Sequence, residues 1–411
     1  MDMTKAGSLI PRERYMAIIR DYIDTPVIKA LTGMRRSGKS FLLMLLKDEL
    51  SRRGISSKNI LYLNFESMQC EHLKEYHALY TEVSKRAESV DGRLYILLDE
   101  IQEVTGWEKA VNSFRVDFDC DIFITGSNAD LLSGELATLL SGRYVKIPIF
   151  PLDFKEYLDF AKHNLDESKL TLREHFKNFL HFGGLPGIHD VKWDANRINL
   201  YLYNIFDTII FEDIISRNNI RDTDLLRRIV NYVMDNIGNT FSAKTISDFL
   251  KNQGRNLSSE TVYNYLQMLE DAFLIHKVSR YDIKGKKILE TQEKYYLSDL
   301  GLRHAVIGYR DNDIAGILEN AVYLELLRRG YTVHIGRQSG AEVDFVADKN
   351  DDRLYVQVTY ILTEDNMDRE FAPLEAIEDN YSKIIISTDS LININRGGIR
   401  QQNIIDFMMS E

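Results

Sequence analysis

The sequence predicts an α/β protein in which a parallel sheet covered by helices comes first, followed by a helical region and a small α/β module. Three observations support this fold class. Short apolar runs alternate with helix-like stretches over the first 150 residues, the pattern becomes mostly helical from residue 151, and strand-like runs return after about residue 290. Near-continuous apolar strands separated by helices are typical of a parallel sheet that is buried on both faces.

Length and composition indicate a soluble protein of two or three domains. The chain has 411 residues, of which 44% are hydrophobic and 27% are charged, and its net charge is -11. This acidic balance argues against a chain that is basic overall, but it leaves room for a local basic patch that contacts DNA. Cys70 and Cys120 belong to no disulfide or zinc pattern, so we expect a cytoplasmic protein. We expect neither a signal peptide nor a membrane span, because no long apolar stretch is present.

The first domain is predicted to cover residues 1–150. Its candidate strands lie at residues 27–31, 59–65, 94–98 and 121–125. Helical stretches lie between them, for example at residues 40–53 and 107–117.

A complete phosphate-binding motif, GxxxxGK[ST], follows the first predicted strand and precedes a helix. Its residues are Gly33, Met34, Arg35, Arg36, Ser37, Gly38, Lys39 and Ser40. Gly33 and Gly38 allow the backbone to curl so that its N–H groups face phosphates, and the positive end of the helix adds to the attraction. Lys39 is expected to reach the β- and γ-phosphates of ATP, and Ser40 to supply a hydroxyl to Mg²⁺.

Two adjacent carboxylates end the third predicted strand, at residues 94–100 (LYILLDE). Asp99 is expected to hold Mg²⁺, directly or through water, and Glu100 to polarise the attacking water. The alternative is a plain exit from strand to loop. Together with the upstream motif, the acidic pair predicts ATP hydrolysis rather than ATP binding alone.

The fourth predicted strand is followed by two further candidate residues and, later, by an arginine. Ser127 or Asn128 is positioned to touch the γ-phosphate or to orient water, unless this segment is a simple turn. Arg143 lies in a glycine-flanked loop and is a candidate arginine finger, acting in its own subunit or in a neighbouring one. A surface arginine or an internal ion pair is the alternative for Arg143.

The segments GMRRSGKS, LLDEIQ, TGSNADLL and LSGRY together resemble the AAA-type ATPase domain of a large prokaryotic family whose members carry a further C-terminal domain. In such proteins the first segment is the Walker A motif, the second the Walker B motif, and TGS the sensor-1 region. The resemblance therefore implies catalytic or binding roles for Lys39, Ser40, Asp99, Glu100 and Ser127. It also implies a P-loop sheet with an additional strand.

The middle region, residues 151–290, is predicted to be helical and to contain a winged helix at about residues 222–290. Helices at residues 242–250 and 258–270 are followed by an apolar run and a basic turn, an outline that resembles the winged-helix domains after many AAA-type modules. One interpretation is DNA contact, and the other is packing against the ATPase domain or a partner protein. The candidate phosphate contacts are Arg255, Asn264, Gln267, Lys284, Lys286 and Lys287.

The last region, residues 291–411, resembles the restriction-endonuclease-like fold. A helix at residues 318–329 carries Glu319, and strands are predicted at residues 331–335, 342–346 and 353–359. Asp344 and Gln357 match metal-site positions of that fold, but Thr359 stands where a lysine is needed. This departure favours a degenerate nuclease-like module used for binding or assembly over an active nuclease.

The first hypothesis for function is therefore a cytoplasmic, Mg²⁺-dependent ATPase of the AAA type that moves a winged-helix domain and a C-terminal module. Its expected partners are DNA or protein, and it is a candidate homo-oligomer. A nucleotide-gated scaffold or sensor with little turnover is the second hypothesis, and an ATP-driven, metal-dependent nuclease is the third.

Overall fold

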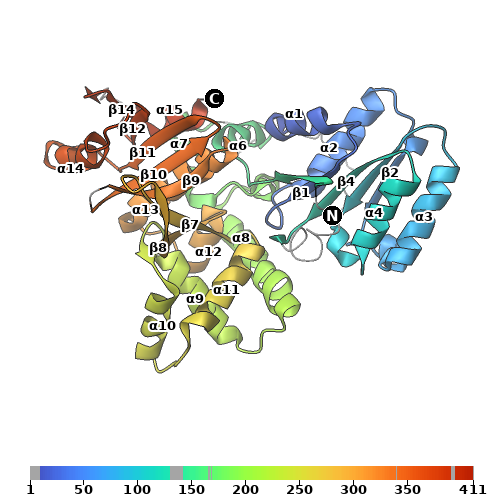
Figure 1. Ribbon diagram of the computed structural model, residues 1–411, viewed down its shortest axis with the longest axis horizontal. Coiled ribbons are helices and arrows are strands. Elements are labelled where there is room, and N and C mark those ends of the chain that lie inside the picture. Colours follow the sequence, from blue (N-terminus) through green and yellow to red (C-terminus); the bar gives the residue numbers. More distant parts are fainter. Residues whose placement is uncertain are drawn as a thin grey trace. The chain divides into compact units, whose positions relative to one another are not determined.

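The computed structural model describes residues 10–129, 142–164, 167, 169–338, 340–389 and 394–410, and Figure 1 shows its elements along the chain. The chain divides into two compact units. The first consists of Met1–Phe150 together with Asp271–Phe273, and the second of Pro151–Glu270 together with Leu274–Glu411. Among the described residues, no helix is long and apolar enough to cross a membrane.

The first unit is built on a five-stranded parallel sheet, which confirms the predicted P-loop type of sheet. Its strand order is β2-β3-β4-β1-β5. The sequence located four of these strands and missed the fifth, β5, because the exposed Lys146 interrupts its apolar run. The strands are β1 (Ile28–Thr32), β2 (Ile60–Asn64), β3 (Leu94–Asp99), β4 (Cys120–Gly126) and β5 (Tyr144–Pro148).

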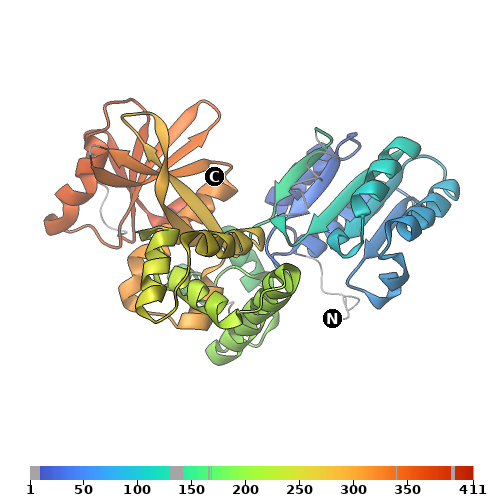
Figure 2. The same cartoon turned by 60° about the horizontal axis from the view of Figure 1, so that its bottom comes forward.

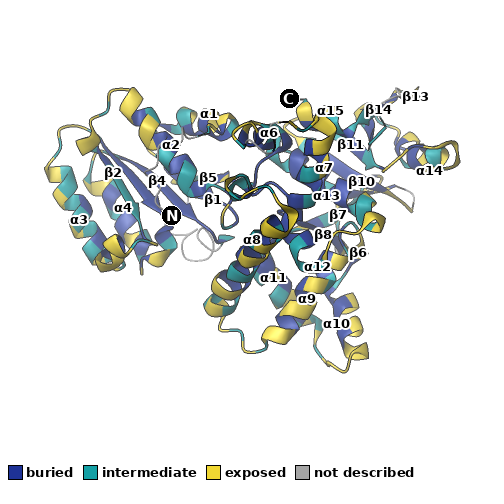
Figure 3. Cartoon of the chain, turned by 180° about the vertical axis from the view of Figure 1, so that it is seen from behind, coloured by how far each residue is buried: buried dark blue, intermediate teal, exposed yellow. Residues whose placement is uncertain are grey.

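Helices cover both faces of this sheet, and this explains why its central strands are apolar without alternation. On β3, Tyr95 and Leu97 pack toward α1 and α2, whereas Ile96 and Leu98 pack toward α3 and α4. Figure 3 shows the exposed residues in yellow on the outer sides of these helices. The helices are α1 (Glu13–Tyr22), α2 (Lys39–Arg52), α3 (Tyr76–Glu88) and α4 (Trp107–Asp117).

The second unit begins with helices, as the pattern after residue 151 predicts. The first two of them, α6 and α7, start with capping boxes, formed by Asp153 with Glu156 and by Thr171 with Glu174. In each box, each side chain accepts from the other residue's backbone N–H. A π-helical segment, Ile209–Ser216, continues α8. The helices are α6 (Phe154–Ala161), α7 (Leu172–Phe182), α8 (Ala195–Thr208), α9 (Thr223–Asp235), α10 (Ala243–Asn252), α11 (Ser259–Asp271) and α12 (Leu300–Ile307).

The second unit also contains a nine-stranded mixed sheet. Its strand order is β13-β14-β12-β11-β10-β9-β7-β8-β6. The hairpin of β7 and β8 belongs to this sheet through parallel pairing of β7 with β9, and Figure 2 shows the gold hairpin running into the orange strands. The division expected between residues 290 and 291 therefore falls inside β8. The first members are β6 (Thr240–Phe241), β7 (Ile275–Asp282), β8 (Lys287–Leu297), β9 (Thr332–Gln338) and β10 (Ala341–Lys349).

The C-terminal part of the sheet packs against three further helices. The helix predicted at residues 318–329 is α13, and it is buried on nearly all sides, including at Glu319 and Glu325. The strands predicted at residues 342–346 and 353–359 are β10 and β11, which pair antiparallel. The remaining elements are β11 (Asp352–Val358), β12 (Ser382–Ser387), β13 (Asn395–Arg396), β14 (Ile399–Asn403), α13 (Ile314–Arg328), α14 (Glu364–Glu375) and α15 (Ile404–Met409).

Candidate nucleotide-binding site

The phosphate-binding motif forms a loop between β1 and α2, where the sequence predicts it. A Cβ atom on Gly33 would lie 2.1 Å from the carbonyl oxygen of Ile149, so only glycine fits there. Arg36 and Gly38 have φ angles of 67° and 100°, which curl the loop into left-handed conformations. Since Gly38 is the N-cap of α2, no side chain caps the first N–H groups of this helix. They are available to an anion.

A buried arginine outside the motif braces this loop. Arg12 has no exposed surface, and its guanidinium donates to the carbonyl oxygens of Ser37, at 2.7 Å, and Phe150, at 3.0 Å. Sequence reasoning missed Arg12, because it lies 25 positions before Ser37 and belongs to no motif.

Lys39 is buried inside the loop. Its ammonium donates to the carbonyl oxygens of Gly33, at 3.0 Å, and Met34, at 3.1 Å, and lies 3.5 Å from Oε1 of Glu100. Arg35, another cation of the motif, pairs with Glu66 at 3.2 Å. Lys39 is thus a motif cation that lies within ion-pair distance of Glu100, the second carboxylate of the acidic pair.

Asp99 has no exposed surface and is the centre of a hydrogen-bond network at the end of β3. One carboxylate oxygen accepts from the hydroxyls of Thr125, at 2.6 Å, and Ser40, at 3.0 Å. The other accepts from the hydroxyl of Tyr62, at 2.9 Å, and the amide of Asn64, at 3.2 Å. Burial raises the pKa of Asp99, and the three hydroxyl donors oppose that rise.

The two predicted metal ligands, Ser40 and Asp99, are therefore in direct contact. Sequence reasoning missed Tyr62, Asn64 and Thr125. A signal was nonetheless present, because Asn64 and Thr125 stand at the carboxyl ends of β2 and β4. In a parallel sheet these ends meet at one edge, beside the end of β3.

Glu100 adopts a strained backbone conformation, with φ and ψ both at 53°. Its N–H donates to the Thr125 hydroxyl at 2.8 Å, and its carboxylate accepts from the Gln102 amide at 2.5 Å. Burial acts to raise the pKa of Glu100, but the Lys39 ammonium and the Gln102 amide outweigh it and hold this pKa below its usual value. Glu100 is therefore ionised at neutral pH, which a proton acceptor requires.

Gln102 connects Glu100 with Ser127. Its amide nitrogen also lies 3.4 Å from the Ser127 hydroxyl, and its oxygen is buried without a hydrogen-bond partner among the described residues. Both Ser127 and Asn128 are buried after β4, and their role at the γ-phosphate stays a prediction. Gln102 was missed as a site residue, although it ends the LLDEIQ segment.

Arg143 lies away from the P-loop. It precedes β5, and its carbonyl oxygen accepts from the N–H of Ile28, at the start of β1, whereas the P-loop follows the end of β1. Its guanidinium donates to Asn112 on α4 at 3.2 Å. A role in cis does not fit this placement, whereas a role in a neighbouring subunit stays a prediction. Two parts of the quoted segments lie outside the described residues, namely Leu140 and Ser141 of LSGRY and Asp130–Leu132 of TGSNADLL.

Comparisons with known proteins agree with this geometry. The sequence pattern of a family described as AAA domain matches residues 25–158, and that of a domain of unknown function matches residues 173–313. A Walker-type ATPase of Pyrococcus abyssi has a similar fold, with a TM-score of 0.52 and 16% identity, over 72% of this chain and 95% of that one.

Two relatives match over almost the whole chain. An uncharacterized protein of Haemophilus influenzae is 42% identical over 99% of this chain and 100% of its own length. An uncharacterized protein of Methanocaldococcus jannaschii is 32% identical over 92% of this chain and 84% of its own length. The chain therefore belongs to the same family as these two proteins, and its first domain is an AAA-type P-loop domain.

Proposed function

We propose that this protein is a Mg²⁺-dependent ATPase of the AAA type that couples hydrolysis to movement of its second unit, with DNA or protein as its partner. The contact of Asp99 with Ser40 beside an ionised Glu100 is the observation that carries this proposal. A loop that only binds nucleotide has no need of a second, strained carboxylate at this position.

The loop residues fit the phosphates of ATP. The Lys39 ammonium is held by uncharged carbonyl oxygens, and phosphate oxygens are stronger acceptors for it. The Ser37 hydroxyl is buried without a partner among the described residues, and the N–H groups that begin α2 have no side-chain cap. These donors would bind and orient the phosphates and stabilise the charge that develops during transfer.

Ser40 and Asp99 would hold Mg²⁺, since they present a hydroxyl and a carboxylate 3.0 Å apart. When bound, Mg²⁺ neutralises negative charge on the phosphates. Tyr62, Asn64 and Thr125 fix the orientation of the Asp99 carboxylate, as outer residues around a metal ligand do. Glu100 would accept a proton from the attacking water, and Gln102 would keep its carboxylate in place.

Two substitutions test the ATPase proposal in the purified full-length protein. Lys39→Ala is expected to weaken ATP binding and to abolish turnover. Glu100→Gln is expected to keep ATP affinity while lowering kcat by about 100-fold or more. The exposed neighbour Glu103 provides a matched control, and Glu103→Gln should leave both quantities unchanged. The proposal fails if both site variants retain full turnover, and a rate near zero for the unaltered protein with and without DNA would favour the scaffold or sensor.

DNA is supported as a partner by the turn between β7 and β8. Lys284, Lys286 and Lys287 are exposed at this turn, which makes a basic tip on an otherwise acidic chain. Arg255, another predicted phosphate contact, pairs instead with Asp222 at 3.4 Å and Asp224 at 3.1 Å. The tip rather than Arg255 is therefore the proposed contact of a winged helix with DNA.

Fluorescence anisotropy with duplex DNA at several salt concentrations tests this contact. Replacing the three lysines of the tip by alanine should weaken binding and flatten the dependence of log K on log salt by about one unit per lost phosphate contact. Arg255→Ala serves as the control and should change the slope little. If the lysine variant binds DNA like the unaltered protein, a protein partner becomes the better proposal.

A further inference from the structure

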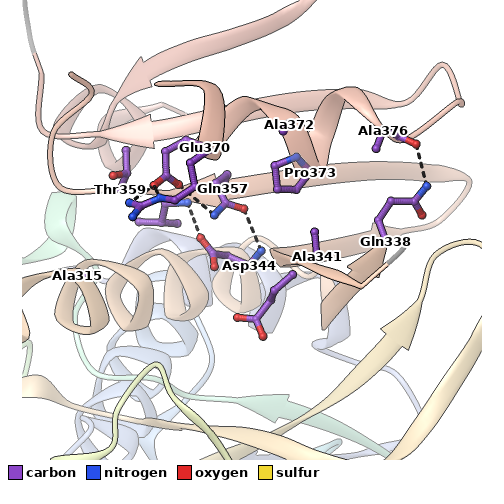
Figure 4. Close-up of a pocket in the computed structure, with 13 residues that line it drawn as sticks. Ala315, Gln338, Ala341, Asp344, Gln357, Thr359, Glu370, Ala372, Pro373 and Ala376 are labelled. Carbon is purple, nitrogen blue, oxygen red and sulfur yellow. Dashed lines mark hydrogen bonds and ion pairs between the residues drawn. The ribbon is translucent and has the colours of Figure 1, made fainter. Parts of the chain in front are cut away.

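A cavity of about 630 Å³ lies in the second unit, between β10, β11 and α14 (Figure 4). Its polar lining includes Glu342, Asp344, Gln357, Thr359, Arg369 and Glu370. Small side chains form much of the rest of the wall, among them Ala315 on α13, Ala341 on β10 and Ala372 on α14. These three alanines are exposed, and their short side chains leave the mouth of the pocket open to solvent.

Asp344 is the central polar group of this pocket and is only 8% exposed. One of its carboxylate oxygens accepts from the N–H of Val358 at 2.7 Å. The other has no hydrogen-bond partner among the described residues, and none of their cationic side chains lies within ion-pair distance of it. Figure 4 shows the Asp344 and Gln357 side chains side by side, joined by a hydrogen bond from the Asp344 N–H to the Gln357 amide oxygen at 3.3 Å.

Thr359 adds a second group without a partner. It too is 8% exposed and lines the pocket, and its hydroxyl makes no hydrogen bond to any residue that the structure describes. Both side chains line the pocket, so their free oxygens are accessible from it. Asp344 and Thr359 therefore point to a ligand that supplies hydrogen-bond donors.

The charges around the pocket call for a cation. Lys294 on β8 is buried between Glu319, at 2.8 Å, and Glu342, at 2.6 Å, so its charge is already shared. Arg369 pairs with Glu370 at 2.6 Å, but the Arg369 side chain is 76% exposed. An ion pair that is exposed to solvent is weak, so Arg369 balances the charge of the pocket poorly.

With Asp344, four carboxyl groups thus face two cations. A ligand with positive charge would supply the counter-charge that Asp344 lacks among the described residues.

The size of the pocket and its apolar wall residues indicate which kind of cation it would bind. Among the described residues, no group of three or more His, Cys, Asp or Glu side chains is arranged to hold a metal ion. The cavity is also much larger than one ion, and its small apolar walls suit an alkyl chain. We propose that this pocket binds an organic cation, an ammonium or guanidinium group on an apolar stem, with Asp344 as its ion-pair partner and Thr359 as an additional acceptor.

Titration calorimetry on the full-length protein tests this site with two probes, the free diamine cadaverine and a capped peptide that contains one lysine. At least one of them should bind, and the tighter one identifies the source of the ammonium group. A peptide with norleucine in place of lysine should not bind. Asp344→Asn should weaken binding about 10- to 100-fold, whereas Asp351→Asn, at the exposed turn between β10 and β11, should leave it unchanged.

Arg369→Gln provides a test in which binding is expected to increase, a result that a misfolded variant would not give. Because Arg369 competes for the carboxylates of the pocket, its removal should tighten binding of the amines severalfold. Thr359→Val should weaken binding of the amines. If thermal unfolding shows that Asp344→Asn is not folded, Thr359→Val serves as the test variant for the pocket in its place. The proposal is overturned if neither amine binds, if the norleucine peptide binds equally well, or if Mn²⁺ binds in an Asp344-dependent manner that the amines do not compete with.

Discussion

At the scale of single residues, Gln102 is expected to orient the Glu100 carboxylate without binding ATP itself. Its amide donates to the Glu100 carboxylate at 2.5 Å and contributes to the low pKa of that carboxyl, yet among the described residues it makes no hydrogen bond to the P-loop. Gln102→Ala should therefore lower kcat about tenfold with little change in ATP affinity. It should also move the acidic limb of the kcat profile to higher pH, since Glu100 must be ionised to accept a proton. An unchanged profile would contradict a positioning role, and exposed Gln69→Ala is the control.

Asp344 makes a second prediction at this scale, about stability rather than turnover. Its pKa is raised by burial and by Glu319, while Lys294 opposes the rise and Glu342 adds to it. A carboxyl whose folded-state pKa exceeds its unfolded value stabilises the fold at low pH, and this contribution is lost as pH rises through the folded pKa. As the pH rises above about 5, Asp344→Asn should therefore gain stability relative to the unaltered protein. Urea unfolding at several pH values measures this, and Asp351→Asn should show no such trend.

At the scale of elements, the turn from β1 to α2 depends on a glycine for steric reasons. A Cβ on Gly33 meets the Ile149 carbonyl oxygen at 2.1 Å, whereas one on Gly92 meets nothing within 4 Å, although Gly92 also has a positive φ of 81°. Gly92→Ala should cost about 1 kcal/mol of backbone strain, and Gly33→Ala about 1–3 kcal/mol more from the clash. Gly33→Ala should also lose ATP affinity, because the loop must shift. Equal melting temperatures for the two variants would show that the loop yields without cost.

At the scale of the whole molecule, the placement of Arg143 turns the arginine-finger hypothesis into a question of assembly. If Arg143 completes the site of a neighbouring subunit, Arg143→Ala and Glu100→Gln should each be inactive alone but regain turnover when mixed, because a mixed pair contains one intact site. Asn112→Ala removes the same hydrogen bond within the subunit and should stay active. A mixture that remains inactive would assign Arg143 to a surface role.

Much of the first unit could be predicted because its signals are local. A strand that is buried on both faces must be apolar throughout, and a loop that wraps phosphates needs glycines at fixed spacing, so β1, β3 and the motif from Gly33 to Ser40 are visible in the sequence. The edge strand β5 was missed because one side of it is exposed, and Lys146 interrupts its apolar run.

The sequence by itself determined the P-loop, the acidic pair Asp99 and Glu100, and the order of strands and helices, since each depends on neighbours along the chain. Only the tertiary structure decided that Arg12 braces the loop and that Tyr62 and Gln102 orient the two carboxylates. It also decided that β8 joins the C-terminal sheet. These contacts connect separate strands and helices, so the geometry that creates them exists only once the sheet has assembled.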